Sequence, residues 1–238
     1  SDSERIPLTI SDYDRERGTI TLIFAPVGET TAELNSLCAG DEICNVCGPL
    51  GNATVVGPGY TVVIGGGVGS AIALPVAKAV KENGGKVTAI LGFRTKELVI
   101  SEDEFRAVCD EVIVTTDDGS YGIKGSVVGP LTEILRNSDG NVPQEVFAVG
   151  SLNMMKYVSL ATVPFGIKTT VSMNPIMIDG TGMCGGCRLR VGGAMKFACV
   201  DGPDFDGHAV DFDSLIKANA RFVEFEQKRK SDCKLFNR

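Results

Sequence analysis

The sequence predicts an α/β chain that also carries a smaller β-rich part. The first segment is rich in β-branched residues, and the middle segment alternates short apolar runs with helical patterns. The last segment combines cysteines and glycines with an amphipathic tail. Alternating strands and helices predict a parallel sheet for the middle segment. We therefore expect three parts, divided where the pattern changes: residues 1–55, 56–170 and 171–238.

The composition is that of an ordinary globular protein, with 238 residues, of which 43% are hydrophobic and 22% charged. A net charge of −7 argues against nucleic acid and anionic membranes as partners, because both would repel an acidic chain. Eight cysteines without a signal-peptide pattern predict a reducing, cytoplasmic setting rather than a disulfide scaffold. The uncharged stretch 43–77 is interrupted by glycines and prolines, so it does not predict a membrane span.

The first part is expected to be a fragment of a β-barrel. Residues 18–24 predict a strand of β-branched and aromatic residues, and the polar stretch 14–18 ends in the glycine that a tight turn uses. Residues 31–37 predict a short helical piece. The strings RIPLT at 5–9 and GETT at 28–31 are uninformative by themselves, although an arginine and a glycine–hydroxyl turn are both able to bind phosphate.

The middle part is expected to be a sheet with helices between its strands. Each predicted strand is a short apolar run, and the first helix stops at a glycine pair. The expected strands are 60–64, 87–93, 111–115, 145–149 and 168–173. The expected helices are 71–83, 102–109, 126–135 and 153–162.

A glycine loop, GGGVG at 65–69, joins the first of these strands to a helix. Glycines let a backbone approach a pyrophosphate, and the free N–H groups at the helix start favour its charge. The match to G-x-G-x-x-G is imperfect because Ser70 stands at the last glycine, and a tight packing turn is the competing interpretation. Loops containing Asp118 and Gly150 follow two other strands, so all three loops are expected at one edge of the sheet.

The last part carries the most specific pattern, D-x4-C-x2-C-x11-C, formed by Asp179, Cys184, Cys187 and Cys199. Plant-type [2Fe–2S] proteins use C-x4-C-x2-C and a distant fourth cysteine, so only the first candidate ligand differs. Glycines between the candidate ligands permit the positive φ angles of a chain that wraps a cluster. A zinc site and buried structural cysteines are the competing interpretations.

Three other features carry weaker signals. Cys44 and Cys47 form a second C-x2-C pair, but a Pro-Leu-Gly turn follows it rather than a helix, so we expect the pair to be incidental. His208, the only histidine, is expected to be a polar turn or interface residue. The tail from residue 211 repeats apolar residues near helical spacing, and its exposed apolar face predicts a docked partner.

Taken together, the strings RIPLT, GETT, GPLG, GGGVG, TTDDGSYGIKG and DGTGMCGGC resemble the ferredoxin-reductase-type flavoproteins that carry a C-terminal [2Fe–2S] module. The resemblance covers nearly the whole chain in the same order. Two types of this family are close: the electron-transfer subunit of dihydroorotate dehydrogenase, and the small subunit of NADH-dependent reduced ferredoxin:NADP oxidoreductase. The first type has cysteine as its first cluster ligand and ends soon after the last one. This chain has Asp179 and continues to residue 238, so it resembles the second type more closely.

The resemblance implies a partial flavin-binding β-barrel, a ferredoxin-reductase-type NAD domain and a small [2Fe–2S] module with a helical tail. Only four residues precede Arg5, whereas family members begin with further barrel strands, so the expected barrel is incomplete. The implied FAD-binding residues, with Thr9 near the isoalloxazine as the catalytic position, are Arg5, Pro7, Leu8, Thr9, Gly28, Thr30 and Thr31. The implied NAD(H)-binding residues are Gly66, Gly67, Val68, Asp118 and Gly150. The implied cluster ligands are Asp179, Cys184, Cys187 and Cys199.

The implied activity is hydride exchange between NAD(H) and FAD, with single electrons passing through the cluster to or from a larger flavoprotein subunit. Ferredoxin would be an indirect partner, and the second type also implies electron bifurcation. One alternative is the electron-transfer subunit of dihydroorotate dehydrogenase or of a hydrogenase. The other alternative is a non-catalytic nucleotide-binding protein with a structural metal.

Overall fold

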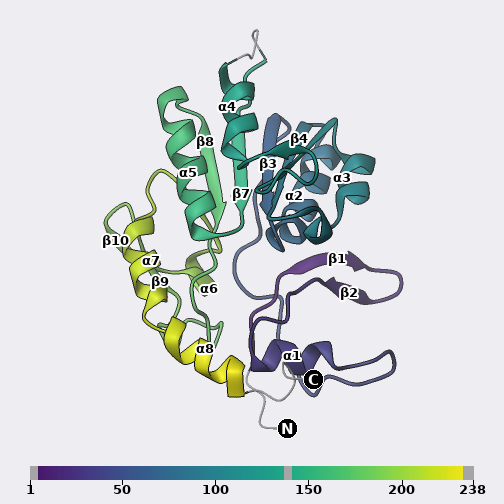
Figure 1. Cartoon of the computed structure of the whole chain (residues 1–238), viewed down its shortest axis with the longest axis vertical. Coiled ribbons are helices and arrows are strands. Elements are labelled where there is room, and N and C mark those ends of the chain that lie inside the picture. The colour runs from purple at the N-terminus through teal and green to yellow at the C-terminus, as the bar shows by residue number, and fades with distance from the viewer. Residues whose placement is uncertain (1–4, 137–140, 233–238) are drawn as a thin grey trace.

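A seven-stranded sheet forms the centre of the molecule, and helices cover both of its faces (Figure 1). The computed structural model describes residues 5–136 and 141–232. The strand order is β11-β8-β7-β3-β4-β5-β6, and every neighbouring pair is parallel except β11 with β8. The strands are β3 (Tyr60–Gly66), β4 (Lys86–Phe93), β5 (Glu111–Thr116), β6 (Ile123–Lys124), β7 (Glu145–Val149), β8 (Lys168–Ser172) and β11 (Asp204–Asp206). The predicted parallel sheet is confirmed.

The strands divide their side chains between two apolar cores, because successive residues of a strand face opposite sides of the sheet. In β3, Val62 and Ile64 pack with α4 and α5, whereas Val63 packs with α2 and α3. These helices are α2 (Gly69–Glu82), α3 (Glu102–Val108), α4 (Val128–Arg136) and α5 (Leu152–Thr162), with short 3-10 turns at Lys96–Leu98 and Val163–Phe165. Packing on both faces explains why the strands are continuous apolar runs. None of the described helices is long and apolar enough to cross a membrane.

The first part of the chain is a small antiparallel hairpin and one short helix, which lie below the sheet in Figure 1. β1 (Ile10–Asp14) pairs with β2 (Thr19–Leu22), and α1 (Glu29–Asn35) follows. β2 is shorter than the predicted strand 18–24, and β1 is an addition to the prediction. Only Ser11 and Ala32 are buried among residues 5–59, so this part has almost no core of its own.

The segment after β8 contains a hairpin and three helices. The elements are β9 (Arg188–Val191), β10 (Ala194–Phe197), α6 (Ala198–Asp201), α7 (Phe212–Ala220) and α8 (Val223–Asp232). Where the sequence predicts one tail helix, the structure has two. α7 buries Phe212 and Leu215 in the core that contains α5, whereas α8 buries none of its side chains. α8 runs toward α1 in Figure 1, and Arg229 of α8 pairs with Glu29 at 3.3 Å.

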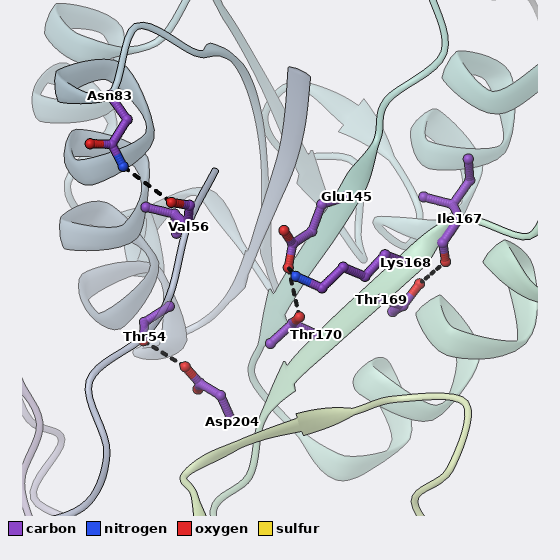
Figure 2. A network of polar contacts seen from close by, with 9 residues as sticks. All are labelled: Thr54, Val56, Asn83, Glu145, Ile167, Lys168, Thr169, Thr170 and Asp204. Carbon is purple, nitrogen blue, oxygen red and sulfur yellow. Dashed lines mark hydrogen bonds and ion pairs between the residues drawn. The ribbon is translucent and has the colours of Figure 1, made fainter. Parts of the chain in front are cut away.

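The linker that leads from the first part into β3 contains Thr54 and Val56. It is held by side chains from two other segments (Figure 2). The Thr54 hydroxyl donates to Asp204 Oδ2 at 2.6 Å, and the Asn83 side-chain amide donates to Val56 O at 3.1 Å. Asp204 belongs to β11, and Asn83 is the C-cap of α2. The linker is therefore tied both to the C-terminal segment and to the helix that follows the glycine loop.

Candidate functional site

The loop after β3 lies at the carboxyl edge of the sheet and leads directly into a helix. β3 ends at Gly66 and α2 begins at Gly69, so the chain turns within two residues. Gly67 has a φ of +56°, a left-handed conformation that favours glycine, and a Cβ there would meet no atom within 4 Å. Val68 is the N-cap of α2 and makes no side-chain cap. The loop thus leaves open space beside Gly67 at the start of a 14-residue helix, while the Gly67 N–H itself donates to Gly92 O at 2.8 Å.

This glycine loop packs backbone to backbone against the loop after β7. A Cβ on Gly69 would lie 2.4 Å from Val149 O, and a Cβ on Gly150 would lie 3.1 Å from Gly66 Cα. Side chains at these positions would therefore push the two loops apart. β3 is also the strand at which the order changes direction, because β4 lies on one side of it and β7 on the other. Ligands of open α/β sheets bind at such a point, outside the carboxyl ends of the strands.

Asp118 lies in the loop after β5, where its carboxylate is engaged by its own loop. Oδ1 accepts hydrogen bonds from the Ser120 N–H at 2.9 Å and from the Ser120 hydroxyl at 2.7 Å. These bonds, led by the one from the backbone N–H, lower the pKa of Asp118. β4 separates β5 from β3, so Asp118 stands at the same edge of the sheet as Gly66 and Gly150 but two strands away from β3.

The residues before β1 form an extended stretch that is largely accessible. Pro7 and Thr9 are exposed, and Leu8 is half-buried. Thr9 directly precedes β1. The Arg5 side chain crosses to the loop after α1, where Nη2 donates to Asn45 Oδ1 at 3.0 Å. The guanidinium is exposed, so it remains accessible to an anionic ligand.

Gly28 and Thr31 build the start of α1. Thr31 Oγ1 accepts hydrogen bonds from the N–H groups of Val27 at 3.0 Å and Gly28 at 2.9 Å, and it donates to Gly28 O at 2.9 Å. Because its single proton goes to Gly28 O, the Thr31 hydroxyl has no proton left to donate to a ligand. Thr30 lies half-buried on the same first turn. Backbone groups are therefore the main donors that this turn offers.

Two of the predicted cluster ligands lie side by side. Cys187 and Cys199 flank the β9–β10 hairpin, and their sulfur atoms are 3.2 Å apart. The Cys199 N–H also donates to the Cys187 sulfur at 3.5 Å. Both side chains are buried, and burial, followed by the neighbouring Cys187, raises the pKa of Cys199. The hairpin thus brings together two sulfur atoms that are distant along the chain.

Cys184 and Asp179 lie on the exposed side of the same loop. The Gly186 N–H donates to the Cys184 sulfur at 3.4 Å, and this contact, followed by the backbone of Asp179, lowers the pKa of Cys184. Asp179 Oδ2 accepts from the Thr181 hydroxyl at 2.5 Å, the Thr181 N–H at 2.9 Å and the Met183 N–H at 3.2 Å. These bonds, led by the Thr181 hydroxyl, lower the pKa of Asp179. All of them reach Oδ2, so they do not engage Oδ1.

The paired sulfur atoms of Cys187 and Cys199 fit one iron of a two-iron cluster. Within residues 5–136 and 141–232 no three His, Cys, Asp or Glu side chains stand around one point. A two-iron cluster divides its ligands between two irons. Cys187 and Cys199 form one pair here, and Cys184 lies near the Asp179 backbone, which helps to lower the Cys184 pKa. The assignment of the four ligands stays a prediction.

The GPLG turn at residues 48–51 packs against the cysteine loop. A Cβ on Gly180 would lie 3.2 Å from Leu50 Cδ1. Two residues after Leu50, the Asn52 N–H donates to Gly202 O at 2.7 Å, and its side-chain amide donates to Val200 O at 3.1 Å. The string GPLG predicts a turn, but the sequence alone does not show that this turn contacts the cysteine loop.

The fold and site define a ferredoxin-reductase-like chain in which a parallel sheet is joined to a C-terminal cysteine loop. Residues 174–211 match the family described as the iron–sulfur cluster binding domain of dihydroorotate dehydrogenase B. A dihydroorotate dehydrogenase B (NAD(+)) electron transfer subunit homolog from Thermotoga maritima is 46% identical over 225 residues, covering 94% of this chain and 78% of that protein. The dihydroorotate dehydrogenase B electron transfer subunit of Streptococcus thermophilus is 35% identical over 209 residues, covering 84% and 78%.

A solved structure gives the same result for the fold. A chain from the NADH-dependent reduced ferredoxin–NADP oxidoreductase structure, described in a study of flavin-based electron bifurcation, has a TM-score of 0.86 and 44% identity. The match covers 97% of this chain and 81% of that chain. This chain therefore belongs to the family of dihydroorotate dehydrogenase B electron transfer subunits and their homologs. The resemblance and the fold class predicted from the sequence are confirmed.

Proposed function

We propose that this chain is the electron-transfer subunit of a flavin- and iron–sulfur-dependent oxidoreductase. It exchanges hydride with NAD(H) at FAD and passes single electrons through a [2Fe–2S] cluster to or from a larger flavoprotein subunit. Its type is that of NADH-dependent ferredoxin:NADP oxidoreductase, with ferredoxin as an indirect partner. The buried sulfur pair of Cys187 and Cys199 carries the proposal, because it lies in a segment that packs on the GPLG turn from the flavin side of the chain.

The nicotinamide side of this proposal rests on backbone geometry. Gly66, Gly67 and Val68 lie beside the open space at the start of α2, where the helix N-terminus favours the charge of the NAD(H) diphosphate, and Gly150 permits the close approach of the two loops. Asp118 lies at the same edge, where its carboxylate is able to accept hydrogen bonds from hydroxyl groups. The bound cofactors supply the hydride and electron chemistry, and the protein holds and orients them.

The flavin side uses the two stretches around β1 and α1. The exposed Arg5 guanidinium is placed to bind the FAD diphosphate, together with the turn formed by Gly28, Thr30 and Thr31. Pro7, Leu8 and Thr9 extend from Arg5 toward β1, which puts Thr9 at the isoalloxazine in this assignment. The residues that we propose to bind FAD are Arg5, Pro7, Leu8, Thr9, Gly28, Thr30 and Thr31.

The flavin-side and cluster-side residues are close enough to interact electrostatically. The positive charge of Arg5 contributes to the lowered pKa of Asp179, after the larger contributions of the hydrogen bonds from Thr181 and Met183. Leu50 of the GPLG turn also contacts the loop at Gly180. In the proposal, Asp179, Cys184, Cys187 and Cys199 hold the cluster at this meeting point, so electrons have a short path to it.

Two features favour the ferredoxin:NADP oxidoreductase type. Asp179 replaces the cysteine of the dihydroorotate dehydrogenase type, and α7 and α8 lie beyond residues 174–211, the part that matches the cluster domain of that type. Dihydroorotate dehydrogenase is the second candidate partner, because relatives of this chain carry that name. Purification of the complex from its native cells separates the two candidates. The proposal expects a larger flavoprotein subunit, and a dihydroorotate dehydrogenase subunit in its place would favour the second candidate.

Iron analysis tests the cluster and its unusual ligand. The purified protein should contain iron and sulfide in equal amounts, and Asp179→Ala should reduce both because one ligand is lost. Asp41→Ala is the matched control, since Asp41 also closes a turn by accepting a backbone N–H, from Cys38 at 2.7 Å. Unchanged iron in Asp179→Ala would remove Asp179 from the ligand set. Zinc without iron or sulfide in the wild-type protein would refute the cluster.

A further inference from the structure

α2 contains a proline that deprives one carbonyl of its usual partner. In an α-helix a carbonyl accepts a hydrogen bond from the N–H four residues later, and for Ala71 that residue is Pro75, which has no N–H. Ala71 is fully buried, so water does not replace the missing donor. Buried carbonyl groups without any partner are rare because they are costly. The Ala71 carbonyl therefore needs a donor from outside the helix.

Ser11 of β1 supplies that donor. Its hydroxyl donates to Ala71 O at 2.9 Å, across a separation of 60 residues in the sequence. The Ser11 side chain is also deeply buried, in a part of the chain where almost every other residue is accessible. Burial of a serine at this position is explained by the vacant carbonyl that it satisfies.

A second contact between β1 and α2 lies further along the helix. Lys78 lies seven residues after Ala71, two turns further along the same face of the helix, and its Nζ donates to Asp12 Oδ2 at 2.8 Å. The Lys78 bond is the largest cause of the lowered pKa of Asp12. This ion pair is partly exposed and contributes little stability by itself. Together the two contacts place β1 directly against α2, as Figure 1 shows.

These contacts join the two segments to which the proposed function assigns the two redox partners. Thr9 stands two residues before Ser11, and Gly69 stands two residues before Ala71. The Ser11–Ala71 bond therefore fixes the flavin-side stretch relative to the glycine loop. Hydride transfer depends on the approach of donor and acceptor, and a displacement of ~1 Å can lower a rate about 10²-fold.

We propose that Ser11 is a positioning residue for hydride transfer, and that Pro75 creates its acceptor by leaving the Ala71 carbonyl unpaired. The catalytic half of this inference rests on the proposed function. Ser11 acts through α2 rather than on a cofactor. Pro75 leaves one carbonyl of α2 without its helical donor, and Ser11 of β1 binds to that carbonyl.

The first test is a double-mutant cycle on thermal unfolding, without NAD(H). Ser11→Ala should lower Tm by about 2–8 °C, because it leaves a buried carbonyl unpaired. In the Pro75→Ala background the N–H introduced at position 75 takes over the carbonyl, so the same serine substitution should shift Tm by only about 1 °C. Non-additivity of this sign supports the pairing. Equal shifts in the two backgrounds would overturn it.

The second test is stopped-flow reduction of the flavin by NADH in the complete, cofactor-loaded complex. Ser11→Ala should lower the limiting rate about 10-fold, change the Kd for NADH less than about 2-fold, and weaken the NADH–flavin charge-transfer absorption. Ser11→Thr retains the hydroxyl and should restore the rate. Ser159→Ala is the matched control, because Ser159 is also buried and donates to a helix carbonyl, Met155 O at 2.8 Å, but within α5 alone.

The outcomes separate this inference from the proposed function. A wild-type complex whose flavin is not reduced by NADH would refute the proposed function. A reducible wild type with an unchanged rate and charge-transfer band in Ser11→Ala would overturn the positioning role and leave the proposed function standing. The expected result is a slow Ser11→Ala, a restored Ser11→Thr and an unaffected Ser159→Ala.

Discussion

The central sheet and the first part of the chain are held together in different ways. The sheet buries apolar side chains on both faces, and Val62, Val63 and Ile64 of β3 are fully buried. Among residues 5–59, burial is limited to Ser11 and Ala32. The first part is therefore positioned by a small number of specific contacts to the sheet and the cysteine loop. Many apolar contacts fix the geometry of the sheet, whereas the placement of the residues proposed to bind FAD depends on individual bonds.

The largest effect is expected from Gly69→Ala, at the contact between the loops after β3 and β7. The added Cβ would lie 2.4 Å from Val149 O, and backbone atoms yield to such a clash only by shifting both loops. We expect loss of NADH-driven flavin reduction and a destabilisation of about 1–3 kcal/mol, with iron content retained. Stopped-flow absorbance, thermal unfolding and iron analysis measure these three quantities.

Gly129→Ala in α4 is the control for this glycine, because a Cβ there meets no atom within 4 Å. It should leave NADH oxidation unchanged and stabilise the protein by up to about 1 kcal/mol through helix propensity. Normal flavin reduction by Gly69→Ala would contradict the assignment of this loop to NAD(H).

The next largest effect is expected on iron and sulfide content, when a cysteine of the buried sulfur pair is replaced rather than an exposed cysteine of the first part. Cys187→Ser should lose most iron and sulfide, because a hydroxyl is a poor ligand for a cluster that its partner Cys199 is expected to share. Cys44→Ser changes an exposed cysteine of the first part and should retain both. Iron and sulfide analysis of the purified variants decides the matter. Equal iron losses in the two variants would contradict the assignment of Cys187, rather than Cys44, as a cluster ligand.

Asp204→Asn tests the contact between the linker and β11 and should have a smaller, pH-dependent effect. Burial raises the pKa of Asp204 above its ordinary value of 3.8, although the Thr54 hydroxyl acts in the opposite direction. The folded state therefore holds this proton more tightly than the unfolded state. The resulting stabilisation is fully present below pH 3.8 and is lost as the pH rises through the folded-state pKa.

At neutral pH the charged carboxylate is therefore the unfavourable form of the buried group. Asp204→Asn should be at least as stable as the wild type at pH 7, and this difference should shrink toward acid pH. Asp204→Ala, which loses the acceptor of the Thr54 bond, should be about 1 kcal/mol less stable. Urea unfolding at several pH values measures these differences. A wild-type advantage that grows toward neutral pH would contradict the sign.

The smallest effect concerns a cysteine at the end of α3. Burial, with a smaller contribution from the charge of Asp110, raises the pKa of Cys109 to about 12. Its thiolate fraction therefore stays low between pH 7 and 9 and rises only as the pH approaches that value. Alkylation by iodoacetamide, followed by mass spectrometry, should modify the exposed Cys38 and Cys44 well before Cys109. Early labelling of Cys109 would indicate that this part of the molecule opens readily.

The sheet could be predicted from the sequence because its strands are defined by local patterns. The predicted strand 145–149 coincides with β7, and β3 continues two residues further than predicted because its glycines keep the ladder to β4. The β9–β10 hairpin had an available signal in Gly192-Gly193, a two-glycine turn whose φ angles are +56° and +80°. β11 has no comparable signal, since it is three residues long and depends on pairing with β8.

The site was predictable as residue types and spacings, but not as contacts. The spacing of Cys184, Cys187 and Cys199 indicated a cluster, yet the 3.2 Å approach of Cys187 and Cys199 depends on a hairpin between them. The link between Ser11 and Ala71 could not be predicted, because the two residues are 60 positions apart and only the fold brings them together. Long-range polar contacts carry no periodic signal in a sequence.

The central claim is that the nicotinamide side and the cysteine loop belong to one electron-transfer path. The most direct test is an anaerobic titration of the complete complex with NADH, in which flavin absorbance and the electron paramagnetic resonance of the cluster are recorded together. The account predicts that NADH bleaches the flavin and produces the signal of a reduced [2Fe–2S] cluster, and that Cys187→Ser retains only the flavin response. Flavin bleaching in the wild type without any cluster signal would contradict the account.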